Sequence, residues 1–280
     1  MVESIKELRE ICYKDSKAKR PLYMELFTMK ISIYVTKLLL YTPIRADQVT
    51  ISMVLLSILG SVLMAFGTLK FLLIGILIIH FTVVLDNVNG EIARYRKEGS
   101  MIGTFLEQFY HEISTPLIFF SLGYGVFMQT GYKSVLIFGF LCAMFSKSVV
   151  IPAIDAAVVK NLLRDAQSGK INDKLRKYTS LVGKANIKGG STKAGAELYH
   201  TYDYIKEFWG WPFNVAYINI IIILEFLNWY YYIIPTYLMI YWYLAIYGVI
   251  SVIIQAISFI VHYKGKTVYH YYISIFKKGK

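Results

Sequence analysis

The sequence has few cysteines, few prolines and little charge. Of its 280 residues, 2 are cysteine, 6 are proline and 17% are charged, whereas 56% are apolar. Two cysteines cannot form the disulfide framework of a small secreted domain, and the separation of Cys12 and Cys142 along the chain matches no metal-binding motif. We expect Cys12 to be a surface thiol and Cys142 to be a small buried hydrophobic residue. The low charge and high apolar content exclude a disordered chain and argue against a soluble enzyme.

The sequence contains several long apolar segments with few charged residues. Crossing a bilayer as a helix takes roughly 20 residues. Segments of suitable length and composition are predicted at 48–67, 71–93, 102–128, 135–159, 211–229 and 235–262. The first 28 or so residues are mixed and charged, unlike a secretory signal peptide. We therefore expect an all-α integral membrane protein with six transmembrane helices.

The chain divides into three predicted parts. They are an N-terminal cytoplasmic and interfacial segment at 1–47, a six-span domain at 48–262 with a cytoplasmic loop at 160–206 between spans 4 and 5, and a basic cytoplasmic tail at 263–280. Within the first part, residues 1–20 are expected to form a surface helix. Residues 29–41 suit a helix in the membrane interface, because Lys30 and Lys37 interrupt a short apolar run.

The positive charge lies at one side of the expected membrane. The net charge is +12, and the 30 Lys and Arg residues are grouped. Nine fall in 1–47, three in 94–97, ten in 160–206 and five in 264–280. These blocks alternate with apolar hairpins, which predicts a cell-membrane protein with both termini in the cytoplasm. Anionic lipid headgroups are the expected partners of such loops, and we expect no nucleic-acid binding.

A cluster of polar residues interrupts the second and third apolar segments. One face of the second segment carries Asp86, Asn89, Gly90 and Ala93, at helical spacing. One face of the third carries Gly103, Glu107 and His111. The short turn at 95–101 should make the two helices antiparallel neighbours, so that these faces meet near the cytoplasmic surface. Polar residues are costly inside spans and therefore indicate function.

Two carboxylates, an amide and an imidazole form a ligand set for a divalent cation. Such a cation would bind a diphosphate and offset charge during phosphoryl transfer. Hydrogen bonding between helices would explain any one of these residues alone, but the shared spacing of all of them favours a metal site. Glu91 and Glu112 fall on other faces.

The spacing Asp86-x2-Asn-Gly-x2-Ala-Arg-x8-Gly-x3-Glu-x3-His111 resembles a family signature. In the CDP-alcohol phosphotransferase family that signature is Asp-x2-Asp-Gly-x2-Ala-Arg-x8-Gly-x3-Asp-x3-Asp. Residues 42–50 resemble the family's segment before the first span, with Asp47 where Asn is usual. With the six-span layout, the resemblance covers residues 20–262. The sequence Gly-Glu-Ile-Ala-Arg and residues 19–22 most resemble the corresponding motifs of the di-myo-inositol phosphate phosphate synthase branch of the family.

The resemblance implies a membrane transferase of phospholipid, polar-lipid or inositol-phosphate biosynthesis. Such an enzyme moves an alcohol-phosphate from a CDP-alcohol donor to the hydroxyl of a lipid or polyol-phosphate acceptor and releases CMP. Membrane lipids and a second copy of the chain are further candidate partners. The implied metal ligands are Asp86, Asn89 and Glu107, and the implied general base is His111. The implied nucleotide-binding residues are Asp86, Gly90, Ala93, Arg94 and Gly103.

Three signature aspartates are replaced, by Asn89, Glu107 and His111. Only Asp86 and Glu107 are then anionic, so one ion, Mg²⁺ or Mn²⁺, is favoured over two. His111 can act as a base, since its reference pKa is near neutrality, can bind a softer metal, or can take no part in turnover. The alternative to an active enzyme is a divergent, inactive relative that binds nucleotide or lipid. A transporter would show polar residues along several spans and an internal repeat.

Other polar residues lie in the predicted spans. Lys147 and Asp155 fall on nearly one face of the fourth, so Lys147 either binds an acceptor phosphate or pairs with Asp155. His80 is expected to hydrogen-bond between helices. The sequence suggests no role for Asn219 and Glu225.

Overall fold

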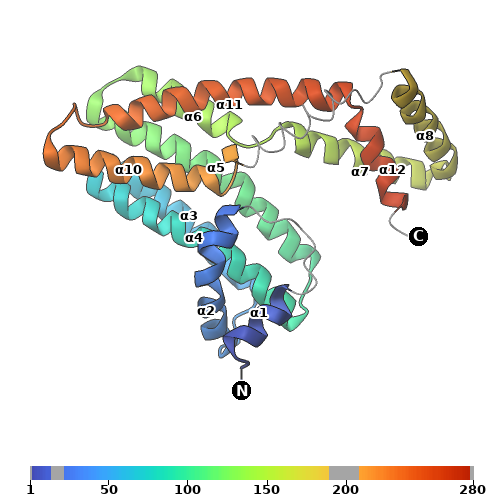
Figure 1. The fold of residues 1–280 in the computed structure, drawn as a ribbon, viewed down its shortest axis with the longest axis horizontal. Coiled ribbons are helices and arrows are strands. Elements are labelled where there is room, and N and C mark those ends of the chain that lie inside the picture. The colour runs from blue at the N-terminus through green and yellow to red at the C-terminus, as the bar shows by residue number, and fades with distance from the viewer. Residues whose placement is uncertain (1, 14–21, 189–207, 278–280) are drawn as a thin grey trace. The chain divides into compact units, whose positions relative to one another are not determined.

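The computed structural model describes residues 2–13, 22–188 and 208–277, and every regular element in these ranges is helical (Figure 1). The helices are α1 (Ile5–Tyr13), the π-helical turn η1 (Met24–Thr28), α2 (Met29–Leu40), α3 (Ala46–Ala65), α4 (Leu69–Arg96), α5 (Met101–Thr130), α6 (Lys133–Phe145), α7 (Val150–Gln167), α8 (Ile171–Lys188), α10 (Phe213–Tyr231), α11 (Leu238–Lys264) and α12 (Thr267–Lys277). The predicted all-α class is confirmed.

Five stretches among the described residues are long and apolar enough to cross a membrane. They are Ala46–Ala65, Leu69–Arg96, Lys133–Gln167, Phe213–Tyr231 and Leu238–Lys264. The protein is therefore a membrane protein. The predicted third span corresponds to α5, a helix of 30 residues that is not among the five. Glu107, His111 and Glu112 near its start and Pro116 within it lower its hydropathy, so the count of six spans is not confirmed.

The predicted fourth span at 135–159 is interrupted. Helix α6 ends at Phe145, and α7 begins at Val150. Pro152 accounts for the break, because its ring would clash with the carbonyl group of Ser148 in a continuous helix and it has no N–H to donate. The prediction that Lys147 and Asp155 share a helix face is wrong, since Lys147 lies in the non-helical segment before α7.

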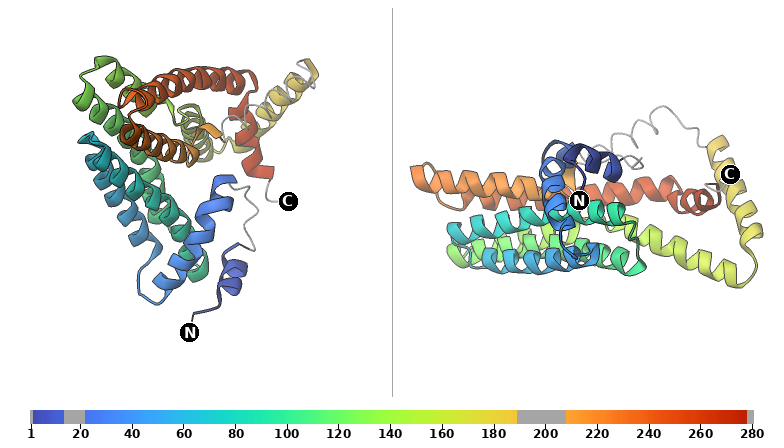
Figure 2. Two further views of the ribbon diagram at one scale, coloured as in Figure 1. Left: turned by 60° about the vertical axis from the view of Figure 1, so that its left-hand side comes forward. Right: turned by 90° about the horizontal axis from the view of Figure 1, so that it is seen from below.

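The chain forms two compact units, one made of 1–146 with 209–249 and the other of 147–208 with 250–280. In the first unit, α3 packs against both α4 and α5, α5 packs on α6, and α10 packs on α4. Figures 1 and 2 show α3 and α4 running side by side. Apolar side chains between these helices form the core, among them Leu72, Ile76, Ile118, Phe119 and Leu122.

Glycines let two helix pairs of this unit approach closely. A Cβ atom added at Gly75 on α4 would lie 2.5 Å from the carbonyl oxygen of Gly60 on α3. A Cβ added at Gly123 on α5 would lie 3.0 Å from the Cα of Gly139 on α6. Small residues of this kind allow backbone-to-backbone packing in membrane helix bundles. The two helices that carry the candidate site are therefore closely packed, α4 against α3 and α5 against α6.

In the second unit α12 packs on α7 and α8, around Ile154, Val158 and Tyr272. Helix α8 lies in the predicted loop at 160–206, where some helix was expected, and residues 189–206 of that loop lie outside the described residues. Helix α12 occupies most of 263–280, which the sequence had indicated only as a basic tail. Aromatic side chains of α12, such as Tyr272, are buried against α7 and α8, and this packing stabilises the helix.

At the N-terminus, α1 packs on α4 and on α2. Leu8 and Cys12, one helical turn apart, face α4 and are 0% and 1% exposed. The prediction that Cys12 is a surface thiol is therefore wrong, while Cys142 is buried as predicted. The helical spacing of Ile5, Leu8 and Cys12 could have indicated an apolar face on α1, but not the helix on which that face packs. The rest of the predicted surface helix, residues 14–20, lies outside the described residues.

Candidate metal centre

The candidate centre is built from α4 and α5, which a short turn connects. Lys97 ends α4 in the left-handed conformation, with φ 56°. The hydroxyl group of Ser100 then accepts a hydrogen bond from the backbone N–H of Gly103, 2.8 Å long, and caps the start of α5. Helix α3 packs closely against both α4 and α5, whereas α4 and α5 share few close backbone contacts and meet through side chains, such as Thr82 and Tyr110 with their oxygens 2.8 Å apart. The two polar faces therefore meet as expected, although the backbones of α4 and α5 have few close contacts.

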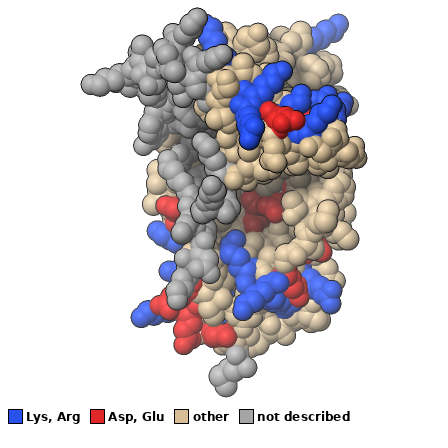
Figure 3. Space-filling view, turned by 90° about the vertical axis from the view of Figure 1, so that its right-hand side faces the viewer, with Lys and Arg blue, Asp and Glu red and all other residues tan. Residues whose placement is uncertain are grey.

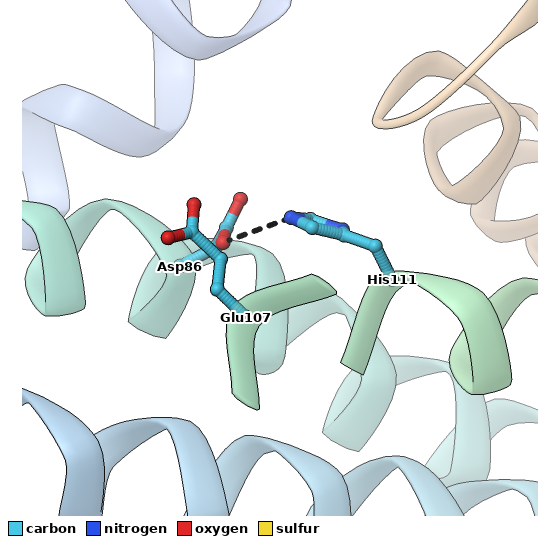
Figure 4. A group of neighbouring side chains, drawn as sticks. All are labelled: Asp86, Glu107 and His111. Carbon is cyan, nitrogen blue, oxygen red and sulfur yellow. Dashed lines mark ion pairs between the residues drawn. The ribbon is translucent and has the colours of Figure 1, made fainter. Parts of the chain in front are cut away.

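Three side chains converge between these helices (Figure 4). Asp86 comes from α4, and Glu107 and His111 come from α5, one turn apart. Nε2 of His111 lies 3.5 Å from Oδ1 of Asp86. One ligand atom from each of the three residues lies within 4.8 Å of those of the other two. Ligands bound to one cation at 2.0 to 2.6 Å have about this spacing.

The centre is partly open to its surroundings. The side chain of Asp86 is 10% exposed and that of His111 is 25% exposed, while Glu107 is exposed. Partial burial of Asp86 strengthens its attraction to a cation, because the local dielectric is lower than in water. The exposed side of the centre leaves a path by which a ligand can enter.

Aromatic rings form one wall of the centre. The ring of His111 meets the edge of Trp211 at a centroid distance of 5.9 Å and that of Tyr110 at 5.0 Å. The hydroxyl group of Tyr110 is 2.8 Å from Oγ1 of Thr82 on α4. The indole of Trp211 lies beside Asp86, but its buried N–H makes no hydrogen bond of normal geometry to another described residue. No spacing in the sequence links Trp211 to the signature, so sequence reasoning missed it.

The other predicted site residues lie along the same helices. Asn89 is 8% exposed, and its side chain makes no hydrogen bond within the described ranges. A Cβ at Gly90 would lie 3.0 Å from the guanidinium group of Arg94, which is exposed. A Cβ at Gly103 would lie 2.7 Å from Oδ1 of Asp47. Gly103 thus leaves room for Asp47, a residue that the sequence had marked only as unusual in its segment.

Other polar residues of the spans have structural partners. His80 bonds between helices as predicted, because Asn219 Nδ2 on α10 lies 3.1 Å from its Nδ1 atom. Glu225 caps the start of α11 by accepting hydrogen bonds from the N–H groups of Tyr237 and Met239, at 2.7 and 3.0 Å. Lys147 belongs to the other compact unit. These contacts give roles to Asn219 and Glu225, for which the sequence suggested none.

No protein-family model matches the chain, and no curated protein matches it either. The resemblance to the CDP-alcohol phosphotransferases therefore rests on the signature residues and their spacing.

Proposed function

We propose that the protein is a membrane phosphotransferase that moves an alcohol-phosphate from a CDP-alcohol to a hydroxyl acceptor and releases CMP. One observation carries the proposal: the two halves of the signature, on α4 and α5, bring Asp86, Glu107 and His111 to within ligand distance of one another. The acceptor is a lipid or a polyol phosphate, and the product belongs to phospholipid or polar-lipid synthesis, including inositol phosphates.

The donor set fits one divalent cation. The carboxylate oxygens of Asp86 and Glu107 suit Mg²⁺ or Mn²⁺, and the nearby imidazole nitrogen of His111 stays free of the metal to act as the base. We assign Asp86 and Glu107 as ligands, with the amide oxygen of Asn89 as a third. When bound, the cation would offset the negative charge of the diphosphate. Two carboxylates offset the mutual repulsion of two such ions poorly, so one ion is proposed.

The remaining residues position the reacting groups. The acceptor oxygen forms a bond to the phosphorus of the alcohol-phosphate, the bond from that phosphorus to the CMP oxygen breaks, and the acceptor's proton passes to Nε2 of His111. The aromatic rings of Tyr110 and Trp211 fix the plane of the imidazole ring. Exposed Arg94 binds the phosphates of the nucleotide, with Gly90 and Ala93 beside it, whereas Gly103 leaves room for Asp47. The predicted acceptor-binding role of Lys147 is not part of this proposal, because Lys147 belongs to the other compact unit.

The proposed location is the cell membrane, with both termini in the cytoplasm. The outward side of η1 and α2 supports an interfacial position, because it carries an apolar stripe at helical spacing. The stripe consists of Phe27, Ile31, Tyr34, Leu38 and Tyr41, each more than half exposed. Lys30 and Lys37 lie on the same helix and suit anionic headgroups. Membrane lipids are thus proposed partners, as is a second copy of the chain.

Nucleic acid is not a proposed partner. On the face drawn in Figure 3, acidic side chains of the described residues lie among the lysines and arginines. Nucleic-acid-binding proteins typically present a patch or stripe of basic charge instead.

A second candidate is a relative that binds nucleotide or lipid without turnover. The observation that favours it is the loss of two signature carboxylates, at Asn89 and His111. Two anionic residues hold a divalent cation and its substrate more weakly than four.

A single experiment separates the two candidates. The purified protein is mixed with a panel of CDP-alcohols, candidate acceptors and Mg²⁺ or Mn²⁺, and mass spectrometry measures CMP and the products. We expect metal-dependent release of CMP, and none from Asp86→Asn. Binding of CDP without any CMP release would favour the inactive relative, and neither binding nor release would contradict both candidates.

A further inference from the structure

A second carboxyl group on α4 is buried and faces away from the candidate metal centre. Glu91, next to Gly90, is 0% exposed. Its side chain accepts hydrogen bonds from Oγ of Ser32 and Oγ1 of Thr36, each 2.5 Å long, and from the hydroxyl group of Tyr13. A buried carboxyl group needs such partners, since leaving it without them costs the full desolvation penalty.

All three donors come from the N-terminal arm, by which we mean α1 and α2. Tyr13 is the last residue of α1, and Ser32 and Thr36 are one turn apart on α2. The thiol of Cys12 adds a contact, with its Sγ 3.5 Å from the carbonyl oxygen of Glu91. Both helices of the arm pack on α4. Besides apolar packing, the polar contacts of both helices of the arm thus converge on one buried residue of the site-bearing helix.

The amino-acid pattern of α2 is arranged around this residue. The inward face of the helix carries Ile33 and the hydroxyl groups of Ser32 and Thr36, all fully buried, whereas its outward face carries the apolar stripe. A surface helix of a soluble protein has the reverse arrangement. Among the described residues, the hydroxyl groups of Ser32 and Thr36 find their partners in Glu91 and, for Ser32, also in the carbonyl group of Met29 at 3.4 Å.

The arm also contacts a residue of the proposed nucleotide pocket. Arg94 follows Glu91 by one turn, and its guanidinium carbon lies 5.9 Å from the centroid of the Tyr13 ring. That distance is within the range of a cation–π contact. The same guanidinium group borders Gly90. Tyr13 therefore donates to Glu91 with its hydroxyl group and supports Arg94 with its ring.

We propose that Glu91 is a positioning residue: it anchors the N-terminal arm to α4 and, through Tyr13, holds Arg94 in place for the nucleotide. The second half of this proposal rests on the proposed function, whereas the anchoring does not. Glu91 itself touches neither substrate nor metal. Its loss should weaken nucleotide binding and leave metal binding by Asp86 and Glu107 intact.

The reactivity of the native Cys12 thiol can report whether α1 is docked on α4. Cys12 and Cys142 are the two cysteines of the chain, and both are buried. Burial, and then the nearby Glu91 carboxylate, raise the pKa of the Cys12 thiol to about 11. A docked Cys12 should therefore react slowly with a water-soluble maleimide at pH 7.5, because the thiolate is the reactive form. Release of α1 would expose it, while Cys142 in α6 reports on the core.

The experiment measures the labelling rate of each cysteine by peptide mass spectrometry, on full-length protein in nanodiscs. We expect Glu91→Leu to accelerate labelling of Cys12 by about tenfold or more, since three hydrogen bonds to one carboxyl group are lost. Thr36→Val, which removes one of them at nearly constant shape, should give a smaller increase. Glu10→Gln is the matched control, because it removes an exposed carboxylate of α1 and should change nothing. Labelling of Cys142 should stay at the parent rate.

Titration with CDP in the presence of Mn²⁺ tests the positioning. Glu91→Leu should raise the Kd for CDP by about fivefold, the loss of one exposed cation–π support, and leave the Kd for Mn²⁺ alone unchanged. Unchanged Cys12 labelling in Glu91→Leu would overturn the anchoring, and faster labelling with unchanged CDP affinity would overturn the positioning. If Glu91→Leu also exposes Cys142, the protein has unfolded and Thr36→Val decides in its place. If the parent binds no CDP, the proposed function fails, and the labelling of Cys12 still decides the anchoring.

Discussion

Nε2 of His111 lies 3.5 Å from Oδ1 of Asp86, and the two residues join helices that meet through side chains with few close backbone contacts. The separation is longer than a strong hydrogen bond and matches two ligands of one cation. It also places the imidazole nitrogen where it can take a proton from a hydroxyl group bound beside Asp86. The two roles of His111, ligand and base, lead to different outcomes on substitution.

Replacing His111 separates these roles. If His111 is the base, His111→Ala should lower the rate of CMP release by roughly 10²–10⁴-fold and leave Mn²⁺ and CDP affinity nearly unchanged. His111→Asp restores the group of the family signature and should keep measurable turnover. CMP release and Mn²⁺ titration are the measurements. Loss of metal binding together with activity would make His111 a ligand, and full CMP release from His111→Ala would rule out both roles.

The carboxylates should dominate metal affinity. Asp86→Asn and Glu107→Gln each replace an anionic ligand by a neutral one, so either change should weaken Mn²⁺ binding by at least about tenfold. Asn89→Asp should strengthen it, because it adds a negative charge one turn from Asp86. Electron paramagnetic resonance of free Mn²⁺ measures these affinities. Glu112→Gln is the control, since Glu112 is an exposed carboxylate on α5 that accepts a hydrogen bond from Gln108. Equal affinities in all four variants would show that the cluster only links the helices.

Much of this arrangement could be predicted from the sequence, because it follows from helical periodicity. The 3.6-residue repeat put Gly103, Glu107 and His111 on one face, and apolar runs placed α3, α4, α10 and α11 within a few residues. Contacts between distant segments leave no such trace. Trp211 beside Asp86, Cys12 against Glu91 and Asp47 against Gly103 each join residues from separate helices or loops.

The break before α7 could have been predicted, and the packing of α4 could not. Pro152 inside an apolar run is a recognisable helix breaker, and the hydropathy of the whole segment concealed it. That α3 packs more closely on α4 than α5 does depends on where small residues meet. Gly60 and Gly75 meet only once both helices are placed, and a single sequence does not pair them.

The contact between Gly60 and Gly75 should be sensitive to one added methyl group. In Gly75→Ala the new Cβ would lie 2.5 Å from a backbone oxygen that cannot move alone, so α3 and α4 must separate. We expect a loss of about 1–3 kcal/mol in stability, as for other overpacked sites. Gly99→Ala is the matched control, because nothing lies within 4 Å of its added Cβ. Thermal unfolding in detergent measures the difference, and equal melting temperatures for the two variants would contradict this close packing.

The proposed topology predicts which connections face the cytoplasm. The connection between α4 and α5 carries basic residues and lies beside the candidate centre, so a cysteine at Gly99 should be cytoplasmic. The connection between α5 and α6 should lie outside, and Tyr132, which is 60% exposed there, is a suitable position for the partner variant. In intact cells, an impermeant maleimide should label Tyr132→Cys. It should label Gly99→Cys only after the membrane is permeabilised. Labelling of the parent protein, whose two native cysteines are buried, gives the background. The sequence also predicts that a tag after Lys280 and a cysteine at Gly189 are cytoplasmic, although both positions lie outside the described residues. Labelling of Gly99→Cys in intact cells would place Asp86, Glu107 and His111 on the side of the membrane where CDP-alcohols are not made, and would contradict both the topology and the proposed reaction.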